Sequence, residues 1–339
     1  MKPSLPFAVL LIMGSACEID DDFGRSNLAD SPGERIGSSL EYISKMIWYQ
    51  DDKVLLHQGH FSVLDLNGQS TGRVTQEQFQ EVLGVTDGGM AIGILAHDDG
   101  TFAVRAVNLE GSDYITLSSG GVDLPAGFVY GDDVFYSETG SDFRQSIFRH
   151  NVVTNQKVPL MEDGVPLAIS PDGTRLLYSQ NQQYITYDFE EGIHIPVASV
   201  NDYPLYVVWN NAGILGYFSA LTPSGESLQI RNLETGSVIA EPNSVSVSRE
   251  SVVVSRDGQR YTYATTRCGN PYYVYDCYDQ PTLIAINEGG LSGPARELAR
   301  HQLKPEDFQL NAGTGAFAPD ASAFVYSLAG GIYYISLNE

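Results

Sequence analysis

Residues 169–179 read ISPDGTRLLYS, a strand-like stretch, a Pro-Asp-Gly turn and a second strand that ends in an aromatic residue. Proline presets φ at the start of a type I turn, and the aspartate bonds forward to the backbone, so the segment predicts a tight β-hairpin. The same unit, with Asp or Asn in its turn, recurs along the chain. The other copies are WYQDDKVLLH (48–57), GVTDGGMAIGIL (84–95), VYGDDVFYS (129–137), VWNNAGILGYFS (208–219), VSRDGQRYTYA (254–264) and FAPDASAFVYS (317–327).

A second element follows each hairpin and consists of one further strand and a polar turn. Its copies read FSVLDLNGQ (61–69), AVRAVNLEGS (103–112), IFRHNVVTNQ (147–156), ITYDFEEGI (185–193), LQIRNLETGS (228–237), TLIAINEGG (282–290) and IYYISLNE (332–339). The two series alternate without a gap, and a short strand such as HIPVAS (194–199) completes a unit. Four antiparallel strands per unit predict an all-β fold, a β-propeller of about seven four-stranded blades.

The two ends of the repeat array predict how the ring closes. The seventh unit stops at Glu339, where its fourth strand should begin, and the stretch IGSSLEYIS (36–44) precedes the first unit without a hairpin of its own. We therefore expect this N-terminal segment to supply the fourth strand of the last blade. Such pairing would leave the ring without an open edge.

Composition agrees with a β fold and restricts the choice of partners. The 339 residues include 34 Gly, 20 Tyr and 14 Phe, a mixture that favours strands and tight turns. The net charge is −23, from 42 acidic and 19 basic residues. A surface this acidic repels phosphate backbones, which argues against nucleic-acid binding. Solubility is one explanation of the charge, and attraction of a cationic partner or Ca²⁺ is another.

The N-terminus has the features of an export signal. Lys2 is followed by an apolar run from Leu5 to Met13, which is too short to span a bilayer. The residues before Cys17, Gly-Ser-Ala, resemble a bacterial lipobox, which implies a lipoprotein signal peptide over 1–16 and lipid attachment at Cys17. Ordinary cleavage after Ala16 without lipid is the alternative. Glu18 in the next position implies the outer membrane, with the lipid as the only membrane contact.

The residues after Cys17 separate the membrane from the domain. Residues 17–36 are polar and acidic and carry no periodic apolar positions, so we interpret them as a flexible tether. Residues 37–339 then form a single propeller domain. The two cysteines left in it, Cys268 and Cys277, lie in TTRCGNPYYVYDCYDQ between two strand-like stretches. In an oxidising compartment such a pair predicts a loop disulfide.

Two segments depart from the regular repeat. Residues 266–281 place four tyrosines beside the two cysteines, and loops on a rigid scaffold often carry binding sites. Tyrosine offers an apolar face and a hydroxyl, so this loop is a candidate for protein or glycan contact, with packing between blades as the alternative. Residues 291–312 have a helical pattern. The four tyrosines are Tyr272, Tyr273, Tyr275 and Tyr278.

The repeat resembles that of TolB-like propellers. The segment Ile169–Ser179 carries the resemblance most clearly, and residues 254–264 and 317–327 are weaker copies. About three of the seven units therefore match. Similar repeats occur in TolB, in propeller domains of prolyl peptidases and in oligogalacturonate lyases. The resemblance implies the fold and leaves the function open.

No catalytic residue, metal site or cofactor site is assigned from the sequence. The histidines, His57, His60, His97, His150, His194 and His301, fall at different positions within their units. His57 and His60 are the closest to a ligand pair, but they flank a turn, where we expect solvated side chains. The aspartates of the tight turns, Asp172, Asp257 and Asp320, are explained as turn formers. Trp48 and Trp209 are expected in the core.

Three functions remain open at this stage. The first is a non-catalytic binding or scaffolding module with an envelope protein as partner. The second is a periplasmic hydrolase or lyase acting on a polysaccharide or a peptidoglycan fragment, and the third is an adhesin-like surface protein. Three or more acids and histidines together at one channel mouth would favour the enzyme. A channel lined by apolar and backbone groups would favour the binding module.

Overall fold

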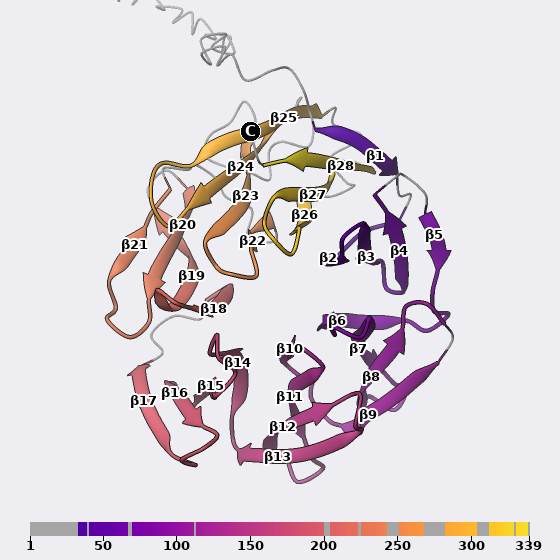
Figure 1. Ribbon diagram of the computed structural model, residues 1–339, viewed down its shortest axis with the longest axis vertical. Helices are drawn as coiled ribbons and strands as arrows, with labels where there is room; N and C mark the ends of the chain where they lie inside the picture. Colours follow the sequence, from indigo (N-terminus) through magenta and orange to yellow (C-terminus); the bar gives the residue numbers. More distant parts are fainter. Residues whose placement is uncertain are drawn as a thin grey trace, which may run out of the picture.

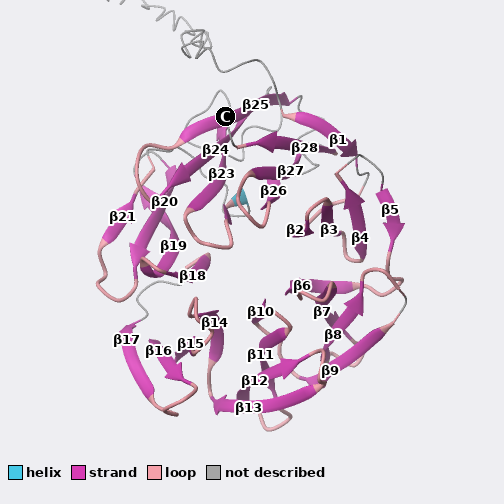
Figure 2. Ribbon diagram, in the orientation of Figure 1, coloured by secondary structure: helices cyan, strands magenta, loops and turns pink. Residues whose placement is uncertain are grey.

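The computed structural model describes residues 33–38, 41–66, 70–111, 113–199, 204–222, 225–242, 251–267, 282–303, 312–328 and 330–337. These residues form seven four-stranded antiparallel sheets arranged as the blades of a ring (Figure 1). Strands account for most of the described chain, and loops connect them (Figure 2). The predicted seven-bladed propeller is confirmed. Within the described ranges, no helix has the length and apolar character needed to cross a membrane.

Each blade has four strands, named a to d from the innermost to the outermost. The a strands of blades 1 to 7 are β2 (Lys45–Gln50), β6 (Phe79–Val85), β10 (Gly127–Tyr130), β14 (Val165–Ile169), β18 (Tyr206–Asn210), β22 (Val253–Val254) and β26 (Ala312–Phe317). The b strands are β3 (Lys53–His57), β7 (Met90–Ala96), β11 (Asp133–Thr139), β15 (Arg175–Gln180), β19 (Gly213–Thr222), β23 (Arg260–Arg267) and β27 (Ala323–Leu328).

The outer half of each blade is built in the same way. The c strands are β4 (Phe61–Asp65), β8 (Phe102–Asn108), β12 (Gln145–Asn151), β16 (Gln183–Asp188), β20 (Gly225–Asn232), β24 (Thr282–Gly290) and β28 (Gly331–Ser336). The d strands are β5 (Ser70–Arg73), β9 (Tyr114–Gly121), β13 (Gln156–Glu162), β17 (His194–Ser199), β21 (Val238–Ala240), β25 (Arg296–Leu303) and β1 (Glu34–Ser38). We call the two faces of the ring the a–b end and the b–c end, after the turns they carry.

The ring closes between its first and last strands, as the sequence predicts. The sheet of blade 7 has the order β1-β28-β27-β26, with Glu34 opposite Tyr334 and Ser38 opposite Gly331. The closing strand begins at Glu34, inside the stretch interpreted as the tether. Ile36 is partly buried and packs against the core between blades 1 and 7, so closure combines strand pairing with apolar burial.

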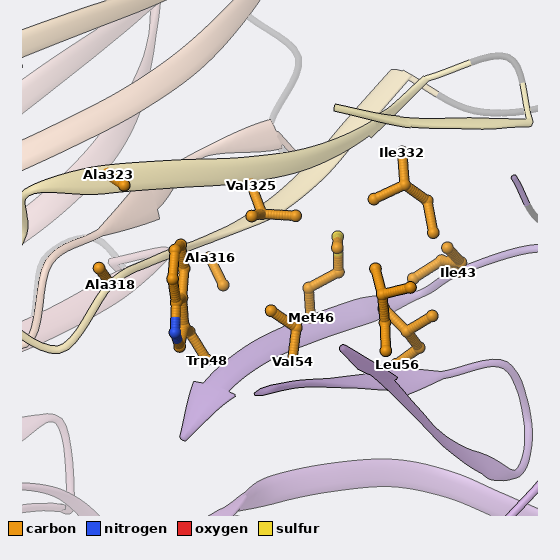
Figure 3. Close-up of a cluster of buried hydrophobic side chains, with 11 residues drawn as sticks. Ile43, Met46, Trp48, Val54, Leu56, Ala316, Ala318, Ala323, Val325 and Ile332 are labelled. Atoms are coloured by element: carbon orange, nitrogen blue, oxygen red, sulfur yellow. The ribbon is translucent and has the colours of Figure 1, made fainter. Parts of the chain in front are cut away.

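Apolar side chains fill the spaces between neighbouring blades. Blades 1 and 7 share a cluster that contains Met46, Trp48, Val54, Val325 and Ile332, all buried (Figure 3). Full burial of a side chain of this size is worth roughly 1.5–3 kcal/mol. Trp48 therefore lies in the core, as predicted. Each blade thus depends on its neighbours for a closed hydrophobic surface.

The aromatic residue that ends the repeated hairpin has a structural role in five blades. In these blades the residue is a fully or almost fully buried tyrosine on strand b: Tyr136, Tyr178, Tyr217, Tyr263 and Tyr326. The hydroxyl of Tyr136 donates to the Leu117 carbonyl of the preceding blade at 2.9 Å. That of Tyr217 donates to the Gly258 carbonyl of the following blade at 3.2 Å. The repeated tyrosine is therefore buried in its blade and, in these two cases, its hydroxyl bonds to a neighbouring blade.

The helical pattern over 291–312 does not produce a helix in the described residues, and that prediction was wrong. Arg296–Leu303 is β25, which pairs with β24 from Thr282↔Leu303 to Glu288↔Arg296. Arg296 donates to Glu288 at 2.9 Å, and Ala299 packs into the core of blades 6 and 7. Pairing with a neighbouring strand outweighs the weak helix propensity of this stretch.

Candidate functional site

The innermost strands of blades 3 to 6 enclose a cavity of about 650 Å³. Its walls are residues 128–130 of β10, 167–169 of β14 and 206–210 of β18, where most side chains are apolar. These three strands are the inner edges of their sheets, and each has one neighbouring strand. Half of their backbone N–H and C=O groups therefore face away from the sheet, toward the channel. The cavity combines an apolar lining with free peptide edges.

The polar lining of the cavity lies at the a–b end. Asn211, Ser255, Arg256, Asp257 and Gln259 come from the a–b turns of blades 5 and 6. They follow directly after strand a in the repeat, so the fold carries them to the same mouth. The side chains of Asn211, Arg256 and Asp257 are exposed, so they are accessible to a ligand. A ligand would meet charged groups at the entrance and apolar groups inside.

The a–b turns are held to one another around this mouth. The amide of Asp87 in blade 2 donates to the Gly131 carbonyl of blade 3 at 3.1 Å. The Tyr130 hydroxyl donates to the Pro171 carbonyl of blade 4 at 3.2 Å. Between blades 5 and 6, the Asn210 side chain donates to the Asp257 carbonyl at 3.0 Å. Hydrogen bonds between blades thus fix the shape of the entrance.

The aspartates of the tight turns form those turns, as predicted. Asp172 Oδ1 accepts bonds from the Ser170 hydroxyl at 2.6 Å and from the Thr174 amide and hydroxyl at 3.0 and 2.8 Å. These bonds, with the Ser170 bond the strongest, lower the pKa of Asp172 to about 2. Asp257 and Asp320 accept equivalent bonds from residues two positions before or after them.

The opposite end of the cavity holds a tyrosine. Tyr206 lines it and keeps 40% of its surface accessible, while burial of its hydroxyl, together with the charge of Glu81, raises its pKa. Lys45 of the first a strand lies near the same carboxylate and donates to the Val82 carbonyl at 2.8 Å. Burial lowers the pKa of Lys45, and Glu81 acts in the opposite direction.

Trp209 packs against the core cluster between blades 4 and 5, so the predicted core position is confirmed in part. It is partly buried, lines the cavity, and carries the guanidinium of Arg175 at 5.1 Å from its ring centre. A tryptophan in this position offers a flat apolar wall with a cationic neighbour. Nothing in the sequence separates it from Trp48, because both lie near the end of an a strand.

His57 and His60 flank the b–c turn of blade 1 as expected, but they are buried and not solvated. His57 is 3% exposed, with Nδ1 2.6 Å from the Ser44 hydroxyl and Nε2 3.0 Å from the Phe79 carbonyl. His60 is 6% exposed and lies 3.5 Å from a carboxylate oxygen of Glu41. The linker before β2 covers this turn, which the sequence does not reveal.

The other histidines do not converge on the cavity. His301 bonds to the Tyr326 hydroxyl at 2.7 Å, and His194 bonds to that of Tyr178 at 2.8 Å, both from outermost strands. In the part of the chain that the structure describes, no three His, Cys, Asp or Glu side chains are grouped so that they could hold a metal ion.

Several predicted site residues lie outside the described residues. These are Cys17, Cys268 and Cys277, and the tyrosines at 272, 273, 275 and 278. The segment 268–281 joins β23 to β24, which assigns it to the b–c connection of blade 6. The predicted lipid site, disulfide and tyrosine loop therefore stay predictions.

Comparisons with known proteins identify the fold. An oligogalacturonate lyase solved in complex with manganese is 12% identical, with a TM-score of 0.54 over 88% of this chain and 89% of that one. TolB from Acinetobacter baumannii is 14% identical, with a TM-score of 0.47 over 86% and 75%. The WD40 domain of SCAP from fission yeast is 10% identical, with a TM-score of 0.44 over 88% and 85%. No protein-family model matches the chain, and no curated protein sequence matches it.

Proposed function

We propose that this chain is a binding module of the bacterial cell envelope, and that it holds a segment of a partner protein at the a–b mouth of its channel. The observation that carries the proposal is the cavity of about 650 Å³, apolar inside and polar at one rim. Pockets that bury most of a ligand's surface combine an apolar lining with a few well-positioned polar groups in this way.

An extended peptide fits this site better than a compact polar molecule. The inner edges of β10, β14 and β18 offer backbone donors and acceptors, which an extended chain can match by adding to a sheet edge. The walls between them can take apolar side chains, and Trp209 supplies a large flat contact. At the rim, Arg256 and Asp257 can pair with polar groups that stay outside.

The proposal includes the location of the protein. We propose that residues 1–16 direct export, that Cys17 carries the lipid and that the outer membrane holds the mature protein. A Cys17→Ser variant should lose incorporation of a labelled fatty acid and appear in the soluble periplasmic fraction. Incorporation of the labelled fatty acid into the Cys17→Ser variant would contradict the proposed lipid site, and it would not bear on the proposed channel site.

Site-specific photocrosslinking tests the binding function. A photoreactive amino acid at Asn211, which is exposed and lines the cavity, should give one defined crosslinked protein in the cells of origin. The matched control is Val238 on the outermost strand of the same blade, which is 50% exposed. We expect no such product from position 238. Equal products from both positions, or none from position 211, would contradict the proposal.

A further inference from the structure

Two neighbouring blades carry turns with the same hydrogen bonds at the b–c end, although the two turns share only the aspartate of the third position. In blade 2 the turn is 97–101, HDDGT, and in blade 3 it is 140–144, GSDFR. In both, the first residue's amide bonds to the fifth residue's carbonyl, at 2.8 and 2.9 Å, and the fourth residue's amide bonds to the first carbonyl, at 3.0 and 2.9 Å. The third residue, an aspartate, accepts a bond from the fifth amide in each. The two turns therefore have the same backbone hydrogen bonds, and their side chains can be compared position by position.

The fourth position of this turn requires a left-handed backbone. Gly100 has φ +81° there, and Phe143 has φ +62°. Glycine adopts this conformation without steric cost, whereas a residue with a bulky side chain is strained by it. Four further turns of the described chain share the left-handed fourth residue and the bond from its amide to the first carbonyl. Three of them have glycine at the fourth position, Gly89, Gly173 and Gly258, and the last has Ala321 with φ +56°. Phe143 is therefore the largest side chain at this position among these turns.

Phe143 gains no burial in exchange for this strain. It is 79% exposed, the highest value among the large hydrophobic residues of the described chain. No ring of another described aromatic residue packs against it. The backbone strain at Phe143 lowers stability, its exposed ring gains little burial to offset the strain, and glycine would remove the strain. The folded chain alone gives no reason for phenylalanine here.

A second exposed apolar residue lies at the same end of blade 3. Leu124, which is 48% exposed, belongs to the linker between blades 2 and 3. The linker runs along strand b of blade 3, because the Val122 amide bonds to the Thr139 carbonyl at 3.0 Å and the Ala126 carbonyl accepts from the Ser137 amide at 2.8 Å. Thr139 directly precedes the turn that carries Phe143.

The charges around these two residues are mainly negative. Asp123, Asp142, Glu162 and Asp163 are all exposed at this end of the blade, and the Asp163 amide bonds to the Gln145 carbonyl next to the turn. Arg144 is the cation of the turn and lies 3.8 Å from Asp142. Exposed apolar and acidic side chains at one end of a blade are complementary to a surface that combines apolar and basic side chains.

We propose that Phe143 and Leu124 form a contact surface for a basic amphipathic segment of a partner protein. The apolar side chains of the segment cover the two residues, and its lysine or arginine side chains pair with the surrounding carboxylates. An aromatic residue is the kind of anchor that carries much of the binding energy at protein interfaces. The inference deepens the proposed binding function, and it concerns the face of the ring opposite the a–b mouth.

Measurements of thermal stability test whether Phe143 strains its turn. Phe143→Gly places glycine at the fourth position of the blade 3 turn, as Gly100 is in blade 2, and we expect Tm to rise by a few degrees. The reciprocal variant, Gly100→Phe, should lower Tm, because it introduces the same strain in the same turn. A lower Tm for Phe143→Gly would show that the ring stabilises the fold and would overturn the inference.

Peptide selection tests whether Phe143 and Leu124 bind a basic amphipathic segment, and it distinguishes this surface from the channel site. A displayed library of random 12-residue peptides is selected on the purified mature protein, and the enriched peptides are measured against variants. We expect one class, apolar with flanking Lys or Arg, to lose at least tenfold in affinity with Phe143→Gly and with Leu124→Ser. The same class should bind unchanged to Val153→Ser, a control at another exposed apolar residue, and to Val207→Trp, which adds bulk to the channel wall.

The outcomes distinguish the two proposals. If every enriched peptide binds Phe143→Gly as tightly as the wild type, or if none is enriched, the contact surface is overturned. Peptides that lose affinity with Val207→Trp alone would support the channel site while overturning the surface at Phe143.

Discussion

The guanidinium of Arg256 lies 3.9 Å from the carboxylate of Asp87, and the two residues belong to the a–b turns of blades 6 and 2. Blades 2 and 6 are not neighbours in the ring, so this ion pair joins opposite sides of the channel mouth (Figure 1). Arg256 also lines the cavity. The pair therefore stands where a ligand would enter, and a cationic ligand group could replace Arg256 beside Asp87.

The Arg256–Asp87 pair should contribute little to the stability of the fold. Both side chains are 66% exposed, and solvent-exposed ion pairs are worth about 0–1 kcal/mol. A double-mutant cycle of Arg256→Ala and Asp87→Ala, followed by urea unfolding, should give a coupling energy below about 1 kcal/mol. A coupling energy of several kcal/mol would instead show that the ion pair stabilises the folded ring.

Removal of the closing strand should destabilise the entire domain. A chain that starts at residue 39 lacks β1 and leaves strand c of blade 7 without its outer partner. We expect it to unfold at a clearly lower temperature and to aggregate through the open edge. A chain that starts at residue 33 keeps β1 and serves as the control. Thermal unfolding followed by circular dichroism compares the two, and equal midpoints would show that the ring does not depend on β1.

The hydrogen bond from Tyr217 to Gly258 should be measurable as a contact between blades 5 and 6. Tyr217→Phe removes the hydroxyl and leaves the buried Gly258 carbonyl short of a donor, at a cost of about 0.5–1.5 kcal/mol. Tyr114→Phe, at an exposed tyrosine on an outermost strand, should change the free energy of unfolding by less than about 0.5 kcal/mol. Urea titration measures both, and equal effects would argue against the inter-blade bond.

Stability should fall below neutral pH because of His57. Burial lowers its pKa below 6.5, with smaller contributions from Lys45 and His60, while the bond to the Phe79 carbonyl acts in the opposite direction. The unfolded chain therefore binds the proton more readily than the folded chain. Stability is fully present above about pH 6.5 and decreases as pH falls from there toward the lower folded pKa.

A comparison of variants assigns this pH dependence. His57→Gln should flatten the decline of Tm between pH 7 and pH 5, whereas His97→Gln, at an exposed histidine in the b–c turn of blade 2, should leave its slope unchanged. A slope that is the same in wild type and His57→Gln would show that other groups govern acid unfolding.

The sequence predicted the architecture because the repeat is local. Each Asp-containing turn and each strand-ending tyrosine is specified within about ten residues, and seven copies in alternation determine the number of blades. The closing strand was also predicted, although it spans Glu34–Ser38 and not 36–44. β25 was missed because its residues favour a helix in isolation, and only its pairing with β24 shows it to be a strand.

The candidate site was less accessible from the sequence. Arg256 and Val207 lie almost fifty residues apart, and nothing in either segment indicates that both line one cavity. A partial signal did exist, because the a strands are the innermost strands of a propeller and the turns that follow them meet at one end of the channel. The burial of His57 and His60 could not be predicted in the same way, since it depends on the linker before β2 and on the neighbouring blade.

A partner segment that enters the channel should be excluded when the channel is narrowed, and the crosslinker at Asn211 can measure that loss. Val207 lines the cavity and packs against the core between blades 4 and 5, so Val207→Trp adds bulk to the cavity wall. Val238→Trp adds the same bulk on the outer edge of the same blade and is the control. With folding verified by circular dichroism, we expect crosslinking in cells to fall at least tenfold with Val207→Trp and to be unchanged with Val238→Trp. Undiminished crosslinking in the Val207→Trp background would contradict the proposed channel site.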